Sequence, residues 1–242
     1  MTSNLVIAIL AAGKGKRMKS SLPKVLHQIN NKTLIENVIE TSFKLNSNKI
    51  IVIVGYKKEL IKSKLNGYNV EFAEQNEQKG TGHAVQQCET HIKNLDGDIL
   101  ILSGDVPMIS EKTLLDLIKV HKVNNSKASL ISADIINPFG YGRIKRDSVN
   151  CFTSIVEHKD ATDEELEINE INAGIYIFDI NTLFSKLSKI KSDNSQGEYY
   201  LGDVLKHIEK DKISIFKTSN QSEILGINNA EQLNEIIEKN IN

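Results

Sequence analysis

Short apolar runs and amphipathic segments alternate through the first half of the chain. The apolar runs, rich in Ile, Val and Leu as strands are, span residues 4–10, 49–55, 68–74 and 98–105. The segments with helical spacing of apolar positions span residues 33–46, 57–65 and 82–94. Thr33 is the expected N-cap of the first helix. This order predicts β-α-β units, and therefore a parallel three-layer α/β core.

The pattern changes after about residue 126. Four strand candidates with little helix between them span residues 128–135, 141–147, 150–160 and 170–180. The tail predicts a helix at 199–210, strands at 213–218 and 223–227, and a helix at 229–240. No internal repeat and no Gly/Ser/Pro-rich linker interrupts the chain. We therefore expect one domain, with a nucleotide-binding half (1–125) and a sugar-binding half with closing helices (126–242).

Composition excludes several classes of protein. The net charge is −1 over 242 residues, so no global basic field exists to hold nucleic acid or an anionic membrane. Cys88 and Cys151 are too few for a disulfide framework or a structural zinc site, and a cytoplasmic location is expected. The apolar start, residues 5–12, is short and follows no Lys or Arg, so a signal peptide is not expected. No apolar run approaches the roughly 20 residues of a membrane span.

The loop LAAGKGKRMKSSLPKVL, residues 10–26, is the candidate anion site. It lacks the spacing of a P-loop, and Met18 stands where a dinucleotide fingerprint needs Gly or Ala. What remains is a small-residue turn followed by cations that suit a triphosphate of charge about −4. The turn is Ala11, Ala12 and Gly13, and the cations are Lys14, Lys16, Arg17 and Lys24. The alternative is a solvated basic loop.

Two oxygen-bearing side chains are candidates for a metal site. Asp105 follows the strand at 98–105, at a carboxyl end where open α/β sheets bind ligands, and a carboxylate there suits Mg²⁺. Its alternative is a turn Asp before Pro107. Asn228 follows the expected strand at 223–227 and offers an amide oxygen. Its alternative is the N-cap of the last helix.

Eight segments in the same order carry a family resemblance. Besides the loop at 10–26 they are EQKGTGHA (77–84), GDVP (104–107), GYGRI (140–144), IVEHKDAT (155–162), EINAGIYIF (170–178), NSQGEYY (194–200) and GINN (226–229). Together they resemble the sugar-1-phosphate nucleotidyltransferases, and within these the uridylyltransferase half of the bifunctional bacterial enzyme that makes UDP-N-acetylglucosamine. The resemblance implies a Rossmann-like nucleotide-diphospho-sugar transferase fold. This fold has a mostly parallel mixed sheet, helices on both faces and a smaller strand-rich sugar-binding region.

The resemblance also implies roles for single residues. Arg17 and Lys24 are the catalytic cations, and Asp105 and Asn228 hold Mg²⁺. The sugar contacts are Gly142, Glu157, Asn172 and Tyr200. The nucleotide contacts are Leu10, Ala11, Ala12, Gly13, Lys24, Gln75, Gly80 and Thr81. Taken alone, Gly80 and Thr81 have the alternative role of capping a helix, and Glu157 that of a surface strand residue. His83 has no role in the expected transfer.

The implied reaction transfers uridylyl from UTP to N-acetylglucosamine-1-phosphate and releases pyrophosphate. The sugar phosphate attacks the α-phosphorus in line and needs no general base, because it is already ionised at pH 7. The product belongs to peptidoglycan and lipopolysaccharide synthesis. Alternatives are another sugar-1-phosphate as acceptor, or a catalytically silent nucleotide-sugar-binding protein. No protein partner is predicted.

Two departures from the family pattern change the expectations. Gly202 stands where the family has a Thr hydroxyl, which weakens the prediction of the sugar more than that of the reaction. The 242 residues contain no hexapeptide repeats. In the bifunctional enzyme such repeats form a left-handed β-helix, which is the acetyltransferase domain and builds the trimer. We therefore expect these residues to form neither that domain nor its trimer.

Overall fold

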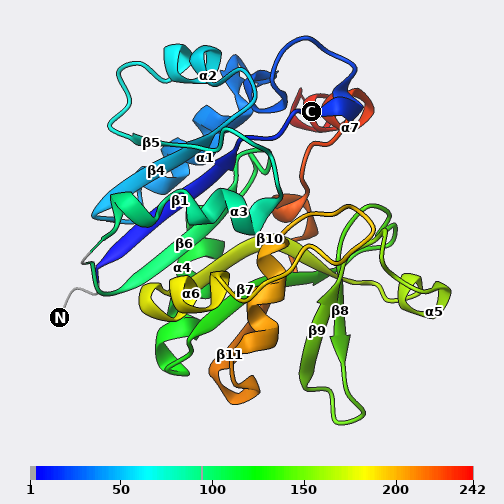
Figure 1. Ribbon diagram of the computed structural model, residues 1–242. Coiled ribbons are helices and arrows are strands. Elements are labelled where there is room, and N and C mark those ends of the chain that lie inside the picture. The colour runs from blue at the N-terminus through cyan, green and yellow to red at the C-terminus, as the bar shows by residue number, and fades with distance from the viewer. Residues whose placement is uncertain (1–3, 94, 242) are drawn as a thin grey trace.

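A mixed sheet forms the centre of the protein (Figure 1). The structure is a computed structural model, and it describes residues 4–93 and 95–241. In the described chain this sheet has nine strands, and seven of them follow one another in the order β11-β7-β10-β6-β1-β4-β5. The seven strands are β1 (Leu5–Ala11), β4 (Lys49–Val54), β5 (Glu71–Glu74), β6 (Asp98–Ser103), β7 (Ala128–Asp134), β10 (Glu170–Asp179) and β11 (Ile213–Lys217). The pair β8 (Arg143–Arg146) and β9 (Phe152–Val156) joins through β10 and projects from the sheet (Figure 1).

The two halves of the chain build different parts of this sheet. Strands β6, β1, β4 and β5 are parallel, as the β-α-β order predicts. Strand β10 runs antiparallel to β6, β7 and β8, which connects the second half of the chain to the parallel core. The predicted mixed α/β sheet with a strand-rich second half is therefore confirmed.

Helices cover both faces of the sheet, because side chains along β1 alternate between two cores. Ile7 and Ile9 belong to the core that also holds apolar residues of α1 (Leu34–Phe43), α2 (Lys58–Lys64) and α4 (Glu111–Val123). Val6 and Ala8 belong to the core shared with α3 (Thr81–Gln86), α6 (Ile180–Leu187) and the 3-10 helix η4 (Leu201–His207). Thr33 caps α1 as predicted, within a capping box with Glu36.

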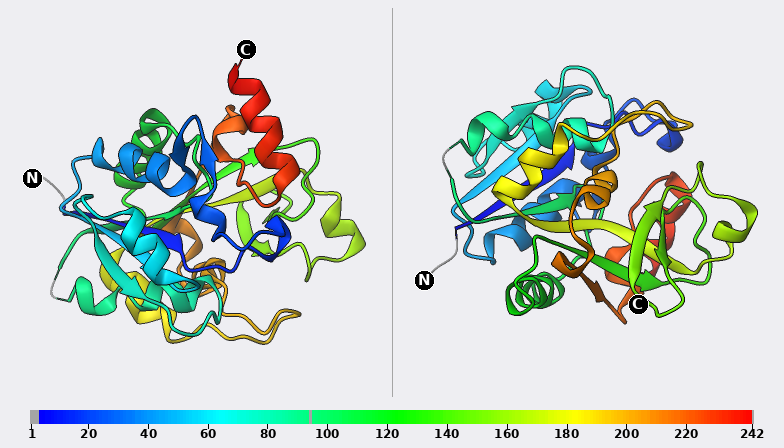
Figure 2. Two further views of the ribbon diagram at one scale, coloured as in Figure 1. Left: turned by 90° about the horizontal axis from the view of Figure 1, so that it is seen from above. Right: turned by 60° about the horizontal axis from the view of Figure 1, so that its bottom comes forward.

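The last helix, α7 (Ala230–Ile241), returns to the beginning of the chain. Leu233 and Ile236 pack against Ile29 and Leu34, near the small ribbon of β2 (Gln28–Ile29) and β3 (Lys32–Thr33). Figure 2 shows this helix beside the segment that follows β1. This contact brings α7 against the segment 29–34.

Several predicted elements differ in the structure. The strand expected at 223–227 is wrong: Gln221–Ile224 is a 3-10 turn (η6), and the Ile227 N–H bonds to the carbonyl of Asp105 at 2.9 Å instead of a neighbouring strand. The helix expected at 199–210 is a 3-10 helix at Leu201–His207, and the one expected at 82–94 ends as an α-helix at Gln86. Helices α4 and α6 fall in segments for which no helix is predicted.

Short helical segments complete the chain. They are α5 (Asp163–Leu166), η1 (Lys16–Met18), η2 (Lys24–Leu26), η3 (Glu89–His91) and η5 (Lys210–Lys212). None of the described helices has both the length and the apolar composition needed to cross a membrane.

Candidate active site

A pocket of about 200 Å³ opens where β1 and β6 end, between the parallel half of the sheet and the β8–β9 arm. Seven of the residues predicted from the sequence line it: Leu10, Thr81, Asp105, Gly142, Glu157, Asn172 and Asn228. Ala11, Ala12, Gly13, Gln75, Gly80 and Tyr200 lie outside the lining, as do Arg17 and Lys24. The pocket thus joins segments that are more than two hundred residues apart in the chain.

A cluster of four polar side chains lies at one side of this pocket. The Lys24 ammonium forms an ion pair with Asp105 and lies 3.2 Å from Oδ1 of Asn228. Arg17 donates to the same Asn228 oxygen at 2.9 Å. Two cations of the loop at 10–26 therefore meet the oxygens of Asp105 and Asn228, from two distant segments, next to the carboxyl ends of the parallel strands.

The local fold explains why Asp105 and Asn228 face each other. Asp105 follows β6 directly, and the Ile227 N–H donates to its backbone carbonyl at 2.9 Å. Gly226 lies beside this carboxyl group: a Cβ there would be 3.7 Å from Oδ2 of Asp105, an ordinary van der Waals contact. The alternative role of Asn228 as a helix cap is wrong, since Asn229 accepts from the Gln232 N–H at 2.8 Å at the start of α7.

The donor set of this cluster fits Mg²⁺. The Lys24 ammonium stands between the oxygens of Asp105 and Asn228, so both already face a common positive charge. Mg²⁺ takes one or two protein oxygens and completes its octahedron with water and phosphate. Within residues 4–93 and 95–241, no three His, Cys, Asp or Glu side chains group in a way suited to a metal, which argues against an all-protein metal cage there.

In the glycine-rich segment after β5, hydrogen bonds hold the Gln75 side chain in place. This side chain is buried, and its amide nitrogen donates to the carbonyl of Gly80 at 3.0 Å and lies 3.0 Å from Nδ1 of His83. Gly80 has a φ of +108° and precedes α3 without a capping side chain. The Thr81 hydroxyl accepts from the Leu201 N–H at 3.0 Å, tying α3 to η4. His83 is thus a neighbour of the predicted base-reading amide.

The loop at 10–26 starts with buried residues and carries exposed cations in its middle. Ala11 and Ala12 are buried, whereas Gly13, Lys14 and Arg17 are exposed. The carbonyl of Leu10 accepts from Gly104 at 2.9 Å and that of Ala12 from Tyr56 at 3.1 Å. These bonds hold the turn against the strands on either side of β1.

Three of the four predicted sugar contacts lie on or next to strands: Gly142 directly precedes β8, Glu157 directly follows β9, and Asn172 lies on β10. The Asn172 amide is held on both ends: its Oδ1 accepts from the Gly174 N–H at 3.1 Å, and its Nδ2 donates to the Tyr176 hydroxyl at 2.6 Å. A Cβ on Gly142 would lie 3.2 Å from Oε1 of Glu157, so this glycine makes room for the carboxyl group. Tyr200 instead donates its hydroxyl to Asp160 at 3.1 Å and stands behind the pocket.

Glu157 has the most perturbed carboxyl group of the pocket. Burial raises its pKa to about 7, and the carboxylates of Asp203, Asp160 and Glu198 add to the shift. Loss of hydration destabilises the charged form, and the acidic neighbours repel it. Near neutral pH this side chain is therefore poised between a neutral form and a carboxylate that accepts hydrogen bonds from hydroxyl groups.

Sequence reasoning missed two tyrosines of the pocket. Tyr141 accepts from the Gly226 N–H at 3.2 Å beside the Asp105 cluster, and burial raises the pKa of its hydroxyl. Tyr176 lies on β10 with 4% of its surface exposed. Both belong to motifs that carry the resemblance, GYGRI and EINAGIYIF, but only the tertiary contacts distinguish them from core aromatics.

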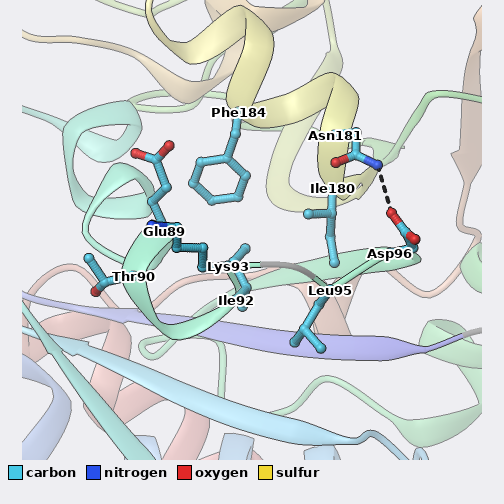
Figure 3. A pocket seen from close by; sticks show the side chains of 9 residues that line it. All are labelled: Glu89, Thr90, Ile92, Lys93, Leu95, Asp96, Ile180, Asn181 and Phe184. Atoms are coloured by element: carbon cyan, nitrogen blue, oxygen red, sulfur yellow. Dashed lines mark hydrogen bonds between the residues drawn. The ribbon is translucent and has the colours of Figure 1, made fainter.

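A larger hollow of about 650 Å³ lies elsewhere, between η3 and α6 (Figure 3). Its charged lining consists of Glu89, Lys93 and Asp96, and Asn181 donates to Asp96 at 3.1 Å. Phe184 forms part of its apolar wall. None of the residues predicted for the site lines this hollow, so size alone does not identify the active site.

Comparison with known proteins assigns the family. Residues 7–221 match the family described as Nucleotidyl transferase. The chain is 45% identical over 235 residues to the bifunctional protein GlmU of Picosynechococcus sp., covering 97% of this chain and 52% of that protein. It is 46% identical over 222 residues to the bifunctional protein GlmU of Staphylococcus carnosus, covering 91% and 49%. The chain therefore belongs to the nucleotidyl transferase family.

The chain spans about half the length of the curated relatives it matches. A solved structure, HddC from Yersinia pseudotuberculosis complexed with GMP-PN, aligns with a TM-score of 0.69 and covers 97% of this chain and 98% of that one. At 21% identity, this likeness shows a shared fold.

Proposed function

We propose that the chain transfers a uridylyl group from UTP to N-acetylglucosamine-1-phosphate, with release of pyrophosphate. The observation that carries this proposal is the meeting of Arg17, Lys24, Asp105 and Asn228 beside the pocket lined by Gly142, Glu157 and Asn172. The identity of 45% to a bifunctional protein GlmU supports it. In this proposal residues 1–125 bind the nucleotide, residues 126–242 bind the sugar, and the reaction takes place in the cytoplasm.

The chemistry follows from the charges of the site. The attacking sugar phosphate is already ionised at neutral pH, so the protein needs to position it in line with the α-phosphorus and to neutralise charge, without a general base. The planar guanidinium of Arg17 suits the oxygens of the leaving pyrophosphate. The Lys24 ammonium, released from Asp105, neutralises charge on the phosphates undergoing transfer.

The metal in this proposal is Mg²⁺, held by the Asp105 carboxylate and the Asn228 amide oxygen. When bound, it supplies Lewis-acid stabilisation and a template for phosphate oxygens. The protein's own contribution is the placement of these two oxygens by the carboxyl end of β6 and by the bond between Ile227 and Asp105.

In this proposal different segments recognise the two substrates: the segment around Gln75 and Gly80, outside the pocket lining, recognises the base, and pocket residues recognise the sugar. The Gln75 amide nitrogen is paired with the Gly80 carbonyl, which leaves the Gln75 amide oxygen to accept from the N3–H of uracil and the Gly80 N–H to donate to a uracil oxygen. The Glu157 carboxylate accepts from sugar hydroxyls, and the free hydrogen of the Asn172 amide donates to a hydroxyl or N-acetyl oxygen.

The test is pyrophosphate release from UTP with Mg²⁺ and one of three acceptors: N-acetylglucosamine-1-phosphate, glucose-1-phosphate or N-acetylgalactosamine-1-phosphate. We expect the first to be strongly preferred. Preference for another acceptor would contradict the proposed sugar and leave the reaction intact. Binding of UTP without release of pyrophosphate in the presence of any of the three acceptors would contradict the proposed enzymatic activity and favour a nucleotide-binding protein.

A further inference from the structure

A buried hydroxyl group with an unused proton faces the candidate sugar pocket. The Tyr176 oxygen accepts from Nδ2 of Asn172 at 2.6 Å, so its own hydrogen is not engaged in that bond. In the described part of the chain no hydrogen bond takes this hydrogen, although the side chain is 4% exposed and lines the pocket. A buried donor without a partner is costly, which indicates that a ligand atom completes it.

The Tyr176 hydroxyl is protonated at neutral pH. Burial raises the pKa of Tyr176 far above its ordinary value, and the nearby carboxyl groups of Glu157 and Asp203 add to the shift. Tyr176 is therefore a neutral donor. It stands next to Glu157, the acceptor of the same pocket.

Gly202 gives this hydroxyl access to the pocket. A Cβ at residue 202 would lie 3.5 Å from the Tyr176 oxygen and 3.2 Å from Cδ1 of Ile155. Any side chain here would stand directly against the hydroxyl, in space that glycine leaves open. The family motif has a threonine hydroxyl at this position, and the structure has a tyrosine hydroxyl beside it.

Strand β10 fixes the tyrosine in this orientation. Its pairing with β7 shifts register between Asn172 and Tyr176, around Gly174 with a φ of +71°. After the shift Tyr176 pairs with Leu130 on one side and Ile101 on the other, in the middle of the sheet. A hydroxyl held by two neighbouring strands is pre-organised for a ligand.

We propose that Tyr176 is a sugar-binding residue: its hydroxyl donates to an oxygen of the sugar-1-phosphate, and Gly202 leaves the room for this contact. The Tyr176 hydroxyl thereby replaces the hydrogen bond that is lost because Gly202 lacks the threonine hydroxyl of the family motif. This inference rests on the proposed function, because it assumes that the pocket binds a sugar phosphate.

The first variant is Tyr176→Phe, which removes only the hydroxyl. We expect KM for N-acetylglucosamine-1-phosphate to rise about two- to tenfold, the value of one hydrogen bond, while KM for UTP and kcat stay within about twofold. Tyr68→Phe is the matched control, since its hydroxyl donates to Glu36 at 3.2 Å on the opposite face of the sheet. An unchanged KM for the sugar phosphate, or equal changes for UTP with a lower melting temperature, would overturn the proposal.

A second comparison separates direct donation from an effect on Asn172. The loss caused by Tyr176→Phe is measured in the wild type and in the Gly202→Thr background. Because a threonine hydroxyl reaches the same space, we expect the loss to be smaller in that background. Equal losses in both backgrounds would overturn direct donation and assign the effect to the freed Asn172 amide.

Calorimetric binding of N-acetylglucosamine-1-phosphate in the presence of Mg²⁺ and UDP distinguishes failure of this inference from failure of the proposed function. Tyr176→Phe should weaken this binding about two- to tenfold even if the wild-type chain releases no pyrophosphate. Equal dissociation constants for wild type and variant would overturn the role of Tyr176. Absence of binding by the wild type would overturn both this role and the proposed sugar site.

Discussion

The Lys24 ammonium lies between the oxygens of Asp105 and Asn228, the two ligands of the proposed metal site. It pairs with the Asp105 carboxylate and lies 3.2 Å from the Asn228 amide oxygen. A side chain and a metal ion that share the same two oxygens compete for them. This relationship links the phosphate-binding loop directly to the candidate metal site and makes both testable by separate substitutions.

Replacement of Asp105 should stop turnover while the fold remains. We expect Asp105→Ala to lower kcat for pyrophosphate release by at least about a hundredfold, because the charged oxygen that holds the metal is lost. Circular dichroism and the melting temperature check the fold. Asp116→Asn is the control, since that residue pairs with Lys112 at 2.8 Å on helix α4. Near-normal activity of Asp105→Ala would contradict the metal assignment.

Removal of the Lys24 ammonium should separate metal binding from catalysis. In Lys24→Ala we expect Mn²⁺, used as a probe of the Mg²⁺ site, to bind about two- to fivefold more tightly, because a partly exposed ion pair worth up to about 1 kcal/mol no longer opposes it. Turnover should fall about a hundredfold, since charge on the reacting phosphates is no longer neutralised. Electron paramagnetic resonance of free Mn²⁺ measures the first effect. Weaker Mn²⁺ binding would contradict the competition.

We expect the charged Glu157 carboxylate to lower the stability of the fold and to strengthen sugar binding. Its pKa is about 7 in the folded protein and 4.5 in the unfolded chain, so the folded state binds more protons between these values. The contribution of Glu157 to the free energy of unfolding therefore falls as the pH rises from about 4.5 through about 7. Glu157→Gln should raise the free energy of unfolding at pH 8 by about 1–3 kcal/mol, and this gain should disappear below pH 4.5.

The same variant should bind the sugar phosphate less well. With a neutral amide in place of the carboxylate, we expect KM for N-acetylglucosamine-1-phosphate at pH 8 to rise about two- to tenfold. Urea unfolding at several pH values measures the stability, and initial rates measure KM. Glu167→Gln, at an exposed position, is the control. A difference in the free energy of unfolding between Glu157→Gln and the wild type that does not grow as the pH rises from about 4.5 to about 8 would contradict the raised pKa of Glu157.

The backbone at Gly80 should tolerate no side chain. A Cβ there would lie 2.6 Å from the carbonyl oxygen of Tyr199, at a φ of +108°. We expect Gly80→Ala to lower stability by about 2–4 kcal/mol and to raise KM for UTP. Gly67→Ala is the matched control, because its φ is +99° but nothing lies within 4 Å of the added Cβ. Equal melting temperatures for the two variants would contradict a close packing of this turn.

Part of the site could be read from residue types and spacing. The cationic loop after the first strand and the carboxylate after the strand at 98–103 both stand at carboxyl ends of a parallel sheet, where ligands bind whatever the rest of the chain does. Asn228 was ambiguous, because two adjacent asparagines precede α7 and either one suits an N-cap. Only the contact of Asn229 with Gln232 separates the cap from the residue that faces Lys24.

The sequence by itself determined the alternation of strands and helices up to β6, the capping of α1 by Thr33 and the family of the chain, since each of these depends on local propensity or on motifs in order. Only the tertiary structure decided that Gln221–Ile224 is a turn, that Tyr200 bonds to Asp160 behind the pocket, and that Tyr176 presents its hydroxyl beside Gly202. The physical reason is that a tyrosine that only packs in the core and a tyrosine that offers its hydroxyl to a ligand stand in the same sequence pattern. Which of the two a tyrosine becomes depends on atoms contributed by distant segments.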